Sequence, residues 1–439
     1  MGLAFLTVVI DLLGFGIVLP LLPRYGTAFG AHDVMLGLLL ASFSLMQFLC
    51  SPMWGRLSDR IGRRPVLMIG LTGSAVFYGL FGFATQLGPS GRWLGLSALA
   101  WLFVSRIGGG LAAATIPTAQ AYIADCTSEE ERGRGMAMIG AAFGVGFTFG
   151  PLLGAVFVPD SLEAPPSPAP GYLAAGLSTL ALCLAAVWLP ESLAPELRGR
   201  TGEPRGWLRL GGVGRAFRRP ALAIAIVTMF LSVFAFGQFE VTLPLLTERL
   251  GLPDRQNFLV FAYIGFVLTL AQGLLVRRLI PRVGEKRMAI AGAALMAVGV
   301  VATLACLPDG GVEREQSLRD VWPLFAVLPV CIVGFGAITP SVQALVSLAA
   351  ERHEQGEMLG VAQSMSSIAR IVAPVVGIPL FQVSPTVAYL EATCVMLAGA
   401  GLLAFLRDPR RHGRDTVAGT QATQAAQSSA AVTDAAAGD

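Results

Sequence analysis

The chain has 439 residues, of which 54% are hydrophobic and only 13% are charged, and its mean hydropathy is +0.67. Soluble domains carry about 25% charged residues, and a single water-facing fold cannot bury this much apolar surface. The formal net charge of +3 is too small to imply bulk attraction to nucleic acid. The composition therefore excludes an ordinary soluble protein and favours one that spans a lipid bilayer.

Twelve apolar runs are each long enough to cross the hydrocarbon of a bilayer, which takes about 20 helical residues. In chain order the runs are Leu3–Leu22, Val34–Trp54, Val66–Thr85, Leu94–Ile116, Met136–Val158, Tyr172–Leu189, Ala221–Leu246, Phe258–Val276, Met288–Leu307, Val321–Ser347, Met358–Phe381 and Val387–Leu406. The first run is too long and too lightly flanked by charge to be a cleaved signal peptide. The sequence thus predicts an all-α membrane protein with twelve transmembrane helices.

The basic residues between the runs predict which side of the membrane each loop faces. With the N-terminus and the even-numbered loops on one side, that side holds 23 Arg and Lys residues and the other side holds six. This split places both termini in the cytoplasm. Lys286 is the single lysine among 31 basic residues, a bias that fits a bacterial origin, and the expected location is then the inner membrane.

A polar, Arg-rich segment divides the runs into two sets of six. The predicted domains are an N-terminal bundle over 1–190, a cytoplasmic linker over 191–219 and a C-terminal bundle over 220–407. Residues 408–439 are rich in Ala, Thr, Gln and Ser and have almost no large apolar residue, which is typical of a disordered tail.

The two sets of runs repeat each other in sequence. An offset of 223 joins Pro117 to Pro340, Gln120 to Gln343, Gly133 to Gly356, Pro151 to Pro374 and Gly154 to Gly377. Leu19–Leu22 matches Leu243–Leu246 at an offset of 224. Because each set crosses the membrane an even number of times, the sets are parallel repeats about an axis along the membrane normal, with a substrate path expected between them.

The start of the chain differs from the start of its second half. The seventh run begins further ahead of Ala235, the repeat partner of Asp11, than the chain begins ahead of Asp11 itself. We therefore expect that the natural start lies upstream, or that the first span is short at its inner end.

The loop between the second and third runs reads Gly55-Arg56-Leu57-Ser58-Asp59-Arg60-Ile61-Gly62-Arg63-Arg64. This loop signature resembles that of the major facilitator superfamily and lies where that family carries it. A weaker copy, Arg278–Lys286, occupies the equivalent loop of the second half, with Pro281 where the acid would stand. The resemblance implies the major facilitator fold of two six-helix bundles.

Three further motifs resemble the twelve-span drug:proton antiporters of the tetracycline-exporter type. They are the first-run motif Asp11–Pro20, the fourth-run motif Arg106–Gly110, and the fifth-run antiporter motif formed by Gly140, Gly144, Gly150, Pro151 and Gly154. Many members end the last motif in Gly-Gly, whereas Ala155 follows Gly154 here. The chain is also similar to animal tetracycline-transporter-like proteins, which are linked to organic anions.

The resemblance implies that the loop signature is a conformational latch. The latch residues are Gly55, Asp59, Arg60, Gly62, Arg63, Arg64 and Asp125. In the family, the acid faces the start of the eleventh span and the second-last arginine pairs with an acid ending the fourth. These contacts become Asp59 near Met358, and Arg63 with Asp125; they would hold the halves together in the outward-open state. The alternative is that the arginines only mark the cytoplasmic side, which leaves Asp59 unexplained.

Four ionisable residues were identified within the runs: Asp11, Arg106, Glu240 and Arg370. A charge in mid-membrane costs at least ~2.5–3.5 kcal/mol on insertion scales, so such residues usually face a cavity or a partner. Asp11 is the first candidate for proton coupling or for recognition of substrate charge; the alternative is a structural pair with Arg106. Glu240 lies toward the outer leaflet, where an interfacial role competes. Arg370 stays charged and either binds an anionic substrate or pairs with Glu240.

The patterns of enzymes and metal sites are missing from the sequence. A P-loop needs Gly-Lys-Ser/Thr, but the single lysine follows Glu285. His32, His353 and His412 fall outside the runs and form no HExxH pattern, and the six cysteines form no CxxC pair. We expect no enzyme activity, no cofactor and no metal, so transport must draw on a gradient.

Together the patterns predict a secondary active transporter that exports a small amphipathic drug-like compound in exchange for protons by alternating access. The expected partners are the small-molecule substrate, the proton and the bilayer; no nucleic acid is expected, and the protein is expected to be a monomer. One alternative is an organic-anion carrier or a uniporter of the same fold, favoured by Arg106 and Arg370. The other is a channel or a non-transporting scaffold, against which the paired halves and Asp59 argue.

Removal of residues 412–439 is predicted to leave transport intact, because this segment has almost no apolar side chain to bury. Uptake or efflux by the shortened protein should be measured beside its amount in the membrane. A shortened protein that reaches the membrane but does not transport would contradict the prediction.

Overall fold

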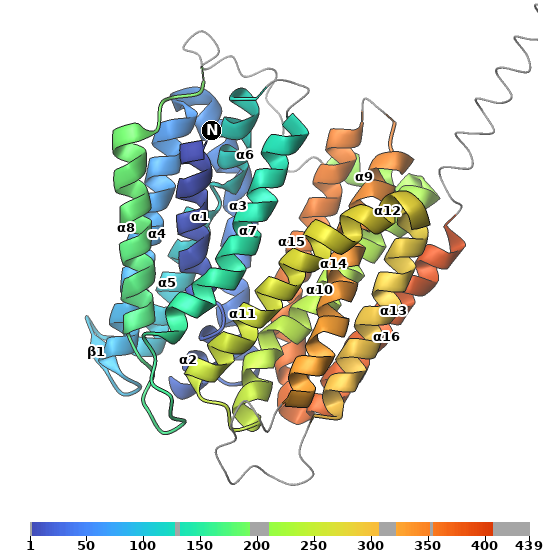
Figure 1. Ribbon diagram of the computed structural model, residues 1–439. Helices are drawn as coiled ribbons and strands as arrows, with labels where there is room; N and C mark the ends of the chain where they lie inside the picture. The colour runs from blue at the N-terminus through green and yellow to red at the C-terminus, as the bar shows by residue number, and fades with distance from the viewer. Residues whose placement is uncertain (1, 128–131, 194–209, 307–321, 352–353, 407–439) are drawn as a thin grey trace, which may run out of the picture.

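The computed structural model describes residues 2–127, 132–193, 210–306, 322–351 and 354–406, which are helical almost throughout. No water is present in the core of a bilayer, so each backbone N–H and C=O must be bonded within the protein. A helix meets this need inside one segment, and the long apolar runs therefore fold as helices (Figure 1).

The first half of the chain forms one helical bundle, coloured blue to green in Figure 1. Its helices are α1 (Gly2–Val18), α2 (Leu22–Ala28), α3 (Asp33–Ile61), α4 (Arg63–Leu87), α5 (Ala98–Ala113), α6 (Ile116–Asp125), α7 (Arg132–Ala155) and α8 (Ala169–Trp188). A short antiparallel hairpin, β1 (Arg92–Trp93) and β2 (Leu96–Ser97), joins α4 to α5.

The second half forms the other bundle, coloured yellow-green to red. Its helices are α9 (Leu210–Arg218), α10 (Pro220–Arg249), α11 (Asp254–Leu270), the π-helical turn η2 (Ala271–Val276), α12 (Arg277–Val283), α13 (Glu285–Leu304), α14 (Trp322–Ala349), α15 (Gln355–Val383) and α16 (Pro385–Phe405).

The predicted all-α, twelve-span architecture is confirmed, since every apolar run coincides with a helix or a broken helix. Among the described residues, ten helices are long and apolar enough to cross a membrane, or eleven if the bent pair α1–α2 is one span. The remaining run is α7, in which Ala141–Ala155 is an apolar helix within the described part.

Two of the spans are broken, and proline stands at each break. The axis bends by 41° between Phe5–Val18 and Leu22–Ala28, where Pro20 lacks the N–H that would continue the helix. The fourth span divides between α5 and α6, which has proline in its first turn. Proline fits a first helical turn because the N–H there has no helical partner anyway.

Parts of the predicted linker and tail lie outside the described residues. In the linker, 194–209 are not described, whereas Leu210–Arg218 form α9. The Arg215 guanidinium on α9 lies 2.6 Å from the Glu357 carboxylate at the start of α15, so this end of the linker is bound to the second bundle. The predicted tail, 408–439, is not described.

The bundles meet mainly along two pairs of helices, α3 with α15 and α7 with α11, and the short helix α2 also contacts α10. Both pairs approach at backbone distance. A Cβ placed on Gly37 of α3 would lie 2.6 Å from the carbonyl oxygen of Pro374 on α15, and one on Gly265 of α11 would lie 2.7 Å from the backbone nitrogen of Thr148 on α7. Small residues permit such approach, which is how helices associate where lipid removes the hydrophobic driving force.

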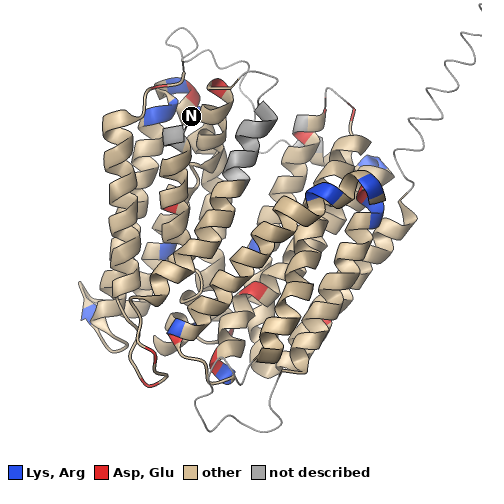
Figure 2. Cartoon of the chain, viewed as in Figure 1, with Lys and Arg blue, Asp and Glu red and all other residues tan. Residues whose placement is uncertain are grey.

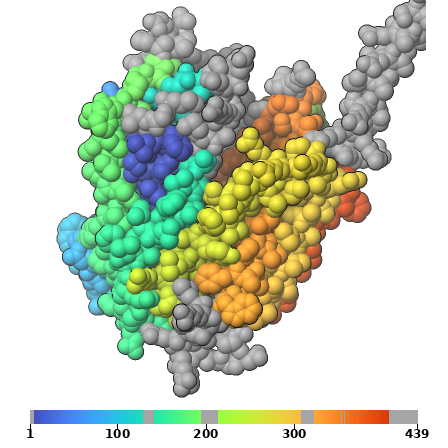
Figure 3. Space-filling model, viewed as in Figure 1, coloured from blue at the N-terminus to red at the C-terminus, as the bar shows by residue number. Residues whose placement is uncertain are grey.

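The contact between the bundles is strongest on the side away from the N-terminus. A continuous buried cluster there includes Leu22 and Leu36 of the first bundle and Leu246 and Phe258 of the second. Toward the N-terminal side the bundles lean apart in the ribbon view (Figure 1), and the space-filled surface recedes between them above the line where α7 meets α11 (Figure 3). We call these the closed side and the N-terminal side.

Candidate functional site

Charged side chains gather at the two ends of the bundles, and few lie between (Figure 2). Asp11 is one of these few. It projects from α1 into the first bundle, where the Ser178 hydroxyl of α8 donates a hydrogen bond of 3.1 Å to Oδ1, and Ser74 of α4 also bonds to it. The Asp11 carboxylate is therefore held by neutral hydroxyls at the joint of three helices.

Arg106, on α5, is buried close to the same region but is not an ion-pair partner of Asp11 among the described contacts. Its guanidinium carbon lies 4.3 Å from the ring centroid of Phe43 on α3, and its Nε has no hydrogen-bond partner. Phe43 continues into further rings, with centroids 5.3 Å from Phe15 and, from there, 5.9 Å to Phe147. A cation thus lies at one end of an aromatic row formed by α3, α1 and α7.

Glu240 and Arg370 are the corresponding charges of the second bundle. Glu240 on α10 is half-buried and Arg370 on α15 is exposed. The Arg370 charge acts on the Glu240 carboxylate, although the described contacts include no ion pair between them. The pairing considered from the sequence is therefore a longer-range attraction here.

The loop signature is tied to its own bundle. Arg63 donates to Asp59 and to the Ser58 hydroxyl at 2.7 Å, and its Nε lies 3.2 Å from Oδ2 of Asp125 at the end of α6. The Arg63–Asp125 contact is the one that the family resemblance implies. Asp59, by contrast, contacts Arg63 in the described structure rather than the start of α15.

Glu191 completes this loop and was not singled out from the sequence. Its carboxylate accepts hydrogen bonds from the backbone N–H of Arg63 at 2.8 Å and of Arg64 at 3.2 Å, where the N-terminus of α4 attracts a negative charge. Gly62 has φ +107°, and any Cβ there would meet the Glu191 carboxylate. Glycine is therefore needed at this turn for both its backbone angle and its lack of a side chain.

The remaining latch and antiporter-motif residues lie as follows. Arg60 is exposed, Gly55 is half-buried, and the Arg64 guanidinium donates to the Ala186 carbonyl at 2.6 Å. On α7, a Cβ at Gly150 would lie 2.8 Å from the Leu13 carbonyl oxygen of α1, whereas one at Gly154 would lie 2.6 Å from the Phe258 ring of α11. Gly144 faces Thr269 of α11, and Pro151 and Gly140 also lie on α7.

The antiporter motif thus leaves α7 small on two faces. One face lies against α1 within the bundle, and the other against α11 across the interface. Small residues on both faces let α7 approach α1 and α11 at backbone distance.

A buried clamp on the closed side was missed by the sequence analysis. Arg24 of α2 is only 6% exposed, and its three guanidinium nitrogens all bind the other bundle. Nε donates to the Pro244 carbonyl at 3.0 Å, one terminal nitrogen pairs with Asp254 at 3.0 Å, and the other donates to the Thr247 hydroxyl at 2.8 Å. We call this set the Arg24 clamp.

The sequence contained a signal for the clamp. Arg24 lies just beyond the repeated Leu-Pro-Leu-Leu segment, and Pro20 and Pro244 are repeat partners. Both of their carbonyls accept a bond from the other bundle, since Asn257 Nδ2 donates to Pro20 at 3.0 Å as Arg24 does to Pro244. A repeat related by an axis along the membrane normal brings equivalent segments together near that axis, but only the folded structure reveals this pairing.

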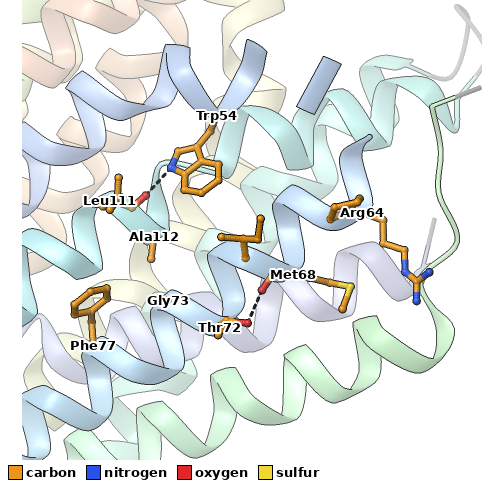
Figure 4. Close-up of a pocket in the computed structure, with 10 residues that line it drawn as sticks. Trp54, Arg64, Met68, Thr72, Gly73, Phe77, Leu111 and Ala112 are labelled. Atoms are coloured by element: carbon orange, nitrogen blue, oxygen red, sulfur yellow. Dashed lines mark hydrogen bonds between the residues drawn. The ribbon is translucent and has the colours of Figure 1, made fainter. Parts of the chain in front are cut away.

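A groove on the first bundle lies apart from these residues. It has a volume of about 750 Å³, is lined mainly by apolar side chains of α3, α4 and α5 (Figure 4), and has Trp54 at one edge with its Nε1 bonded to the Leu111 carbonyl at 2.8 Å. Its α4 residues include Thr72 and Phe77, whereas Ser74 of α4 binds Asp11. The groove therefore uses a different face of α4, and its apolar lining suits lipid chains.

Two parallel six-helix bundles, with charged side chains inside the spans and a polar clamp between the bundles, define a membrane transporter. The chain belongs to the major facilitator superfamily: the model of that family matches residues 4–374 and 272–435. These proteins are transporters rather than enzymes, in agreement with the sequence prediction.

Similar proteins include bacterial resistance proteins and animal major facilitator superfamily domain-containing proteins. The tetracycline resistance protein of class C from Escherichia coli is 31% identical over 390 residues, covering 86% of this chain and 88% of that protein. Major facilitator superfamily domain-containing protein 10 from Bos taurus is 28% identical over 465 residues, covering 93% of each. Multidrug resistance protein 2 from Bacillus subtilis (strain 168) is 26% identical, covering 89% of this chain and 90% of that protein. The predicted resemblance to both groups is confirmed.

Solved structures agree with the fold. The crystal structure of the human organic anion transporter MFSD10 (TETRAN) superposes with a TM-score of 0.61 at 26% identity, covering 92% of this chain and 98% of that one. A D-xylose–proton symporter superposes with a TM-score of 0.69 at 16% identity, covering 93% and 97%, and this likeness concerns the fold alone.

Replacement of Asp59 by Asn is predicted to impair transport while leaving membrane insertion intact, because it removes a charge that binds Arg63 without altering a span. Transport rates should be compared with those of Arg56→Gln, which changes one exposed charge near the same end of α3. Wild-type transport by Asp59→Asn would show that Asp59 is only a loop charge.

Loss of the Arg24 clamp is predicted to open the closed side. Hydrogen bonds to charged groups contribute about 1.5–3 kcal/mol each, so Arg24→Met should raise the population open on that side by at least about tenfold. Spin labels on Val156 and Val383, which are 74% and 82% exposed on different bundles, report the separation by pulsed electron resonance.

The matched control for the clamp is Arg255→Met, because Arg255 makes only an exposed contact of 3.8 Å with Asp160 on the same side. Its distance distribution should stay close to that of the wild type. If Arg24→Met separates the labels no more than Arg255→Met does, the clamp does not hold this side closed.

Proposed function

We propose that this protein exports a small amphipathic drug-like compound in exchange for protons by alternating access. The observation that carries the proposal is Asp11, an acid inside a transmembrane bundle that is held by the hydroxyls of Ser178 and Ser74 and has no cation paired to it among the described contacts. A proton antiporter needs a group that can change charge within the bundle, which an arginine cannot do, so Asp11 is suited to take up and release a proton.

The arrangement of contacts between the bundles supports alternating access. The Arg24 clamp holds one side closed, while on the N-terminal side Asp59 is bound within its own bundle. In the opposite conformation the clamp opens and Asp59 faces the start of α15. The 23 to 6 split of basic residues assigns the N-terminal side to the cytoplasm, so the described state faces inward, in the inner membrane if the host is bacterial.

The substrate class rests on the aromatic row beside Arg106 and on the relatives. Phe43, Phe15 and Phe147 form a row of apolar rings, and aromatic rings favour contact with other planar rings. The bacterial relatives are named as tetracycline or multidrug resistance proteins, and this favours export of an amphipathic compound. We propose that the protein works as a monomer, because each chain already contains both bundles.

The second candidate is an organic-anion carrier, and a specific observation favours it. Arg106 and Arg370 are two fixed cations inside the spans, and neither has an ion-pair partner among the described contacts; a solved relative is also named as an organic anion transporter. Competition between anionic and cationic aromatic compounds for the purified protein distinguishes the two. Stronger binding of the anions, lost in Arg106→Gln, favours the carrier.

Coupling is predicted to depend on Asp11. Asp11→Asn keeps the side-chain shape but cannot change charge, so proton-driven accumulation of substrate should fall by at least about tenfold for each unit of pH gradient, while exchange of substrate across the membrane continues. Both are measured in proteoliposomes with and without a pH gradient. Glu240→Gln is the matched variant of the second bundle.

Each result has a distinct meaning for coupling. If Asp11→Asn retains full proton-coupled transport while Glu240→Gln abolishes it, coupling belongs to the second bundle and the assignment to Asp11 is wrong. If wild-type protein moves substrate without protons, the carrier is a uniporter or is coupled to another ion.

A further inference from the structure

An additional acid lies inside a span of the second bundle. Glu391 is in α16, which is apolar enough to cross the membrane over Pro385–Phe405, and one of its carboxylate oxygens, Oε2, is buried without a hydrogen-bond partner. Glu391 lies within the predicted run Val387–Leu406 but was not among the four charges that the sequence analysis named within the runs.

The side chain that faces Glu391 is the Gln238 amide of α10. Gln238 is 2% exposed, and neither its amide oxygen nor its amide nitrogen has a hydrogen-bond partner of good geometry. Gly377 of α15 comes so close that a Cβ there would lie 2.9 Å from Cγ of Gln238. The Gln238 side chain is therefore packed closely against α15, beside the acid.

The helices packed against α16 are α10, α13 and α15, and they present no cation to this carboxylate among the described residues. Arg249 at the end of α10 lies over the Phe381 ring, 4.6 Å from its centroid. Lys286 of α13 binds the carbonyls of Ala404 and Leu406 at the other end of α16. Arg370 of α15 acts on Glu240 rather than on this acid.

An ionised carboxylate here would have no cation to pair with, which is costly within a span. A protonated acid has no such cost. Its O–H can donate to the amide oxygen of Gln238 while its carbonyl oxygen accepts from the amide nitrogen, and this reciprocal pair satisfies the groups that the structure leaves without partners.

The position of Glu391 in the second bundle resembles that of Asp11 in the first. Asp11 lies between the first and last spans of that bundle, α1 and α8, and Glu391 lies between the first and last spans of the second, α10 and α16. We propose that Glu391, seated against Gln238, is a second proton-binding site, so that each bundle carries one proton. The inference rests on the proposed proton-coupled transport; the chemistry is binding of a proton to a carboxylate, with no other bond changed.

Infrared difference spectra of the purified wild-type protein test the binding of the proton directly. Acidification of the sample should produce a carboxylic-acid carbonyl band that is missing in Glu391→Gln and shifted in Gln238→Leu, which removes the hydrogen-bonding amide. A purely structural role for Gln238 predicts no shift. Glu163→Gln, a change of the same type in an exposed loop, should leave the band unchanged.

Transport assays in proteoliposomes test whether the proton bound by Glu391 is used in transport. Loss of one coupled proton lowers the maximal accumulation of substrate by about tenfold for each unit of pH gradient, so Glu391→Gln should accumulate about tenfold less at one unit while exchange continues. If Glu391→Gln accumulates substrate to the same ratio as the wild type, Glu391 has no role in coupling. The absence of a Glu391 band, or a band that sodium ions abolish at constant pH, overturns the proton site itself.

The two proposals fail in different ways. If wild-type protein shows no proton flux with substrate, the proposed function fails, and the infrared band still decides whether Glu391 binds a proton. If wild-type flux is normal and the band is absent, only the second site is wrong.

Discussion

Inside a bilayer no water reaches the polar groups of a protein, so each of them must find its partner within the fold. This constraint makes every span a helix. It also makes polar side chains that bond outside their own helix stand out. Most polar residues in the spans bond to their own helix, as the Thr148 hydroxyl does to the Gly144 carbonyl at 2.8 Å. The exceptions, an acid held by hydroxyls and a guanidinium against a ring, are the residues to which a function can be assigned.

The same constraint shapes the interface between the bundles. Where lipid supplies no hydrophobic force, the bundles associate through close backbone approach at residues such as Gly37 and Gly265, and through directed polar bonds. The Arg24 clamp concentrates those bonds on the closed side. A buried guanidinium with all its nitrogens bound across an interface is costly to separate from its partners.

Three acids within the spans have different surroundings. Asp11 has hydroxyl partners, Glu240 is acted on by the charge of Arg370, and Glu391 faces an amide. The partner of each acid favours or disfavours the charged form of its carboxyl group. This influence decides whether an acid can bind and release a proton or stays charged. The similarity to both tetracycline resistance proteins and an organic anion transporter fits a fold in which these side chains, rather than the helices, set the substrate.

The sequence by itself determined the class of fold, because the bilayer sets the length that an apolar run needs and because the prolines repeated at an offset of 223 indicate two matching halves. It also identified Asp11, Arg106 and the loop signature, since a charge in an apolar run is visible without a structure. The tertiary structure alone decided which groups meet: Arg24 with Asp254, Glu191 with the turn at Gly62, and Gln238 with Glu391. These partners are far apart in the chain and are joined by packing, which no local pattern encodes.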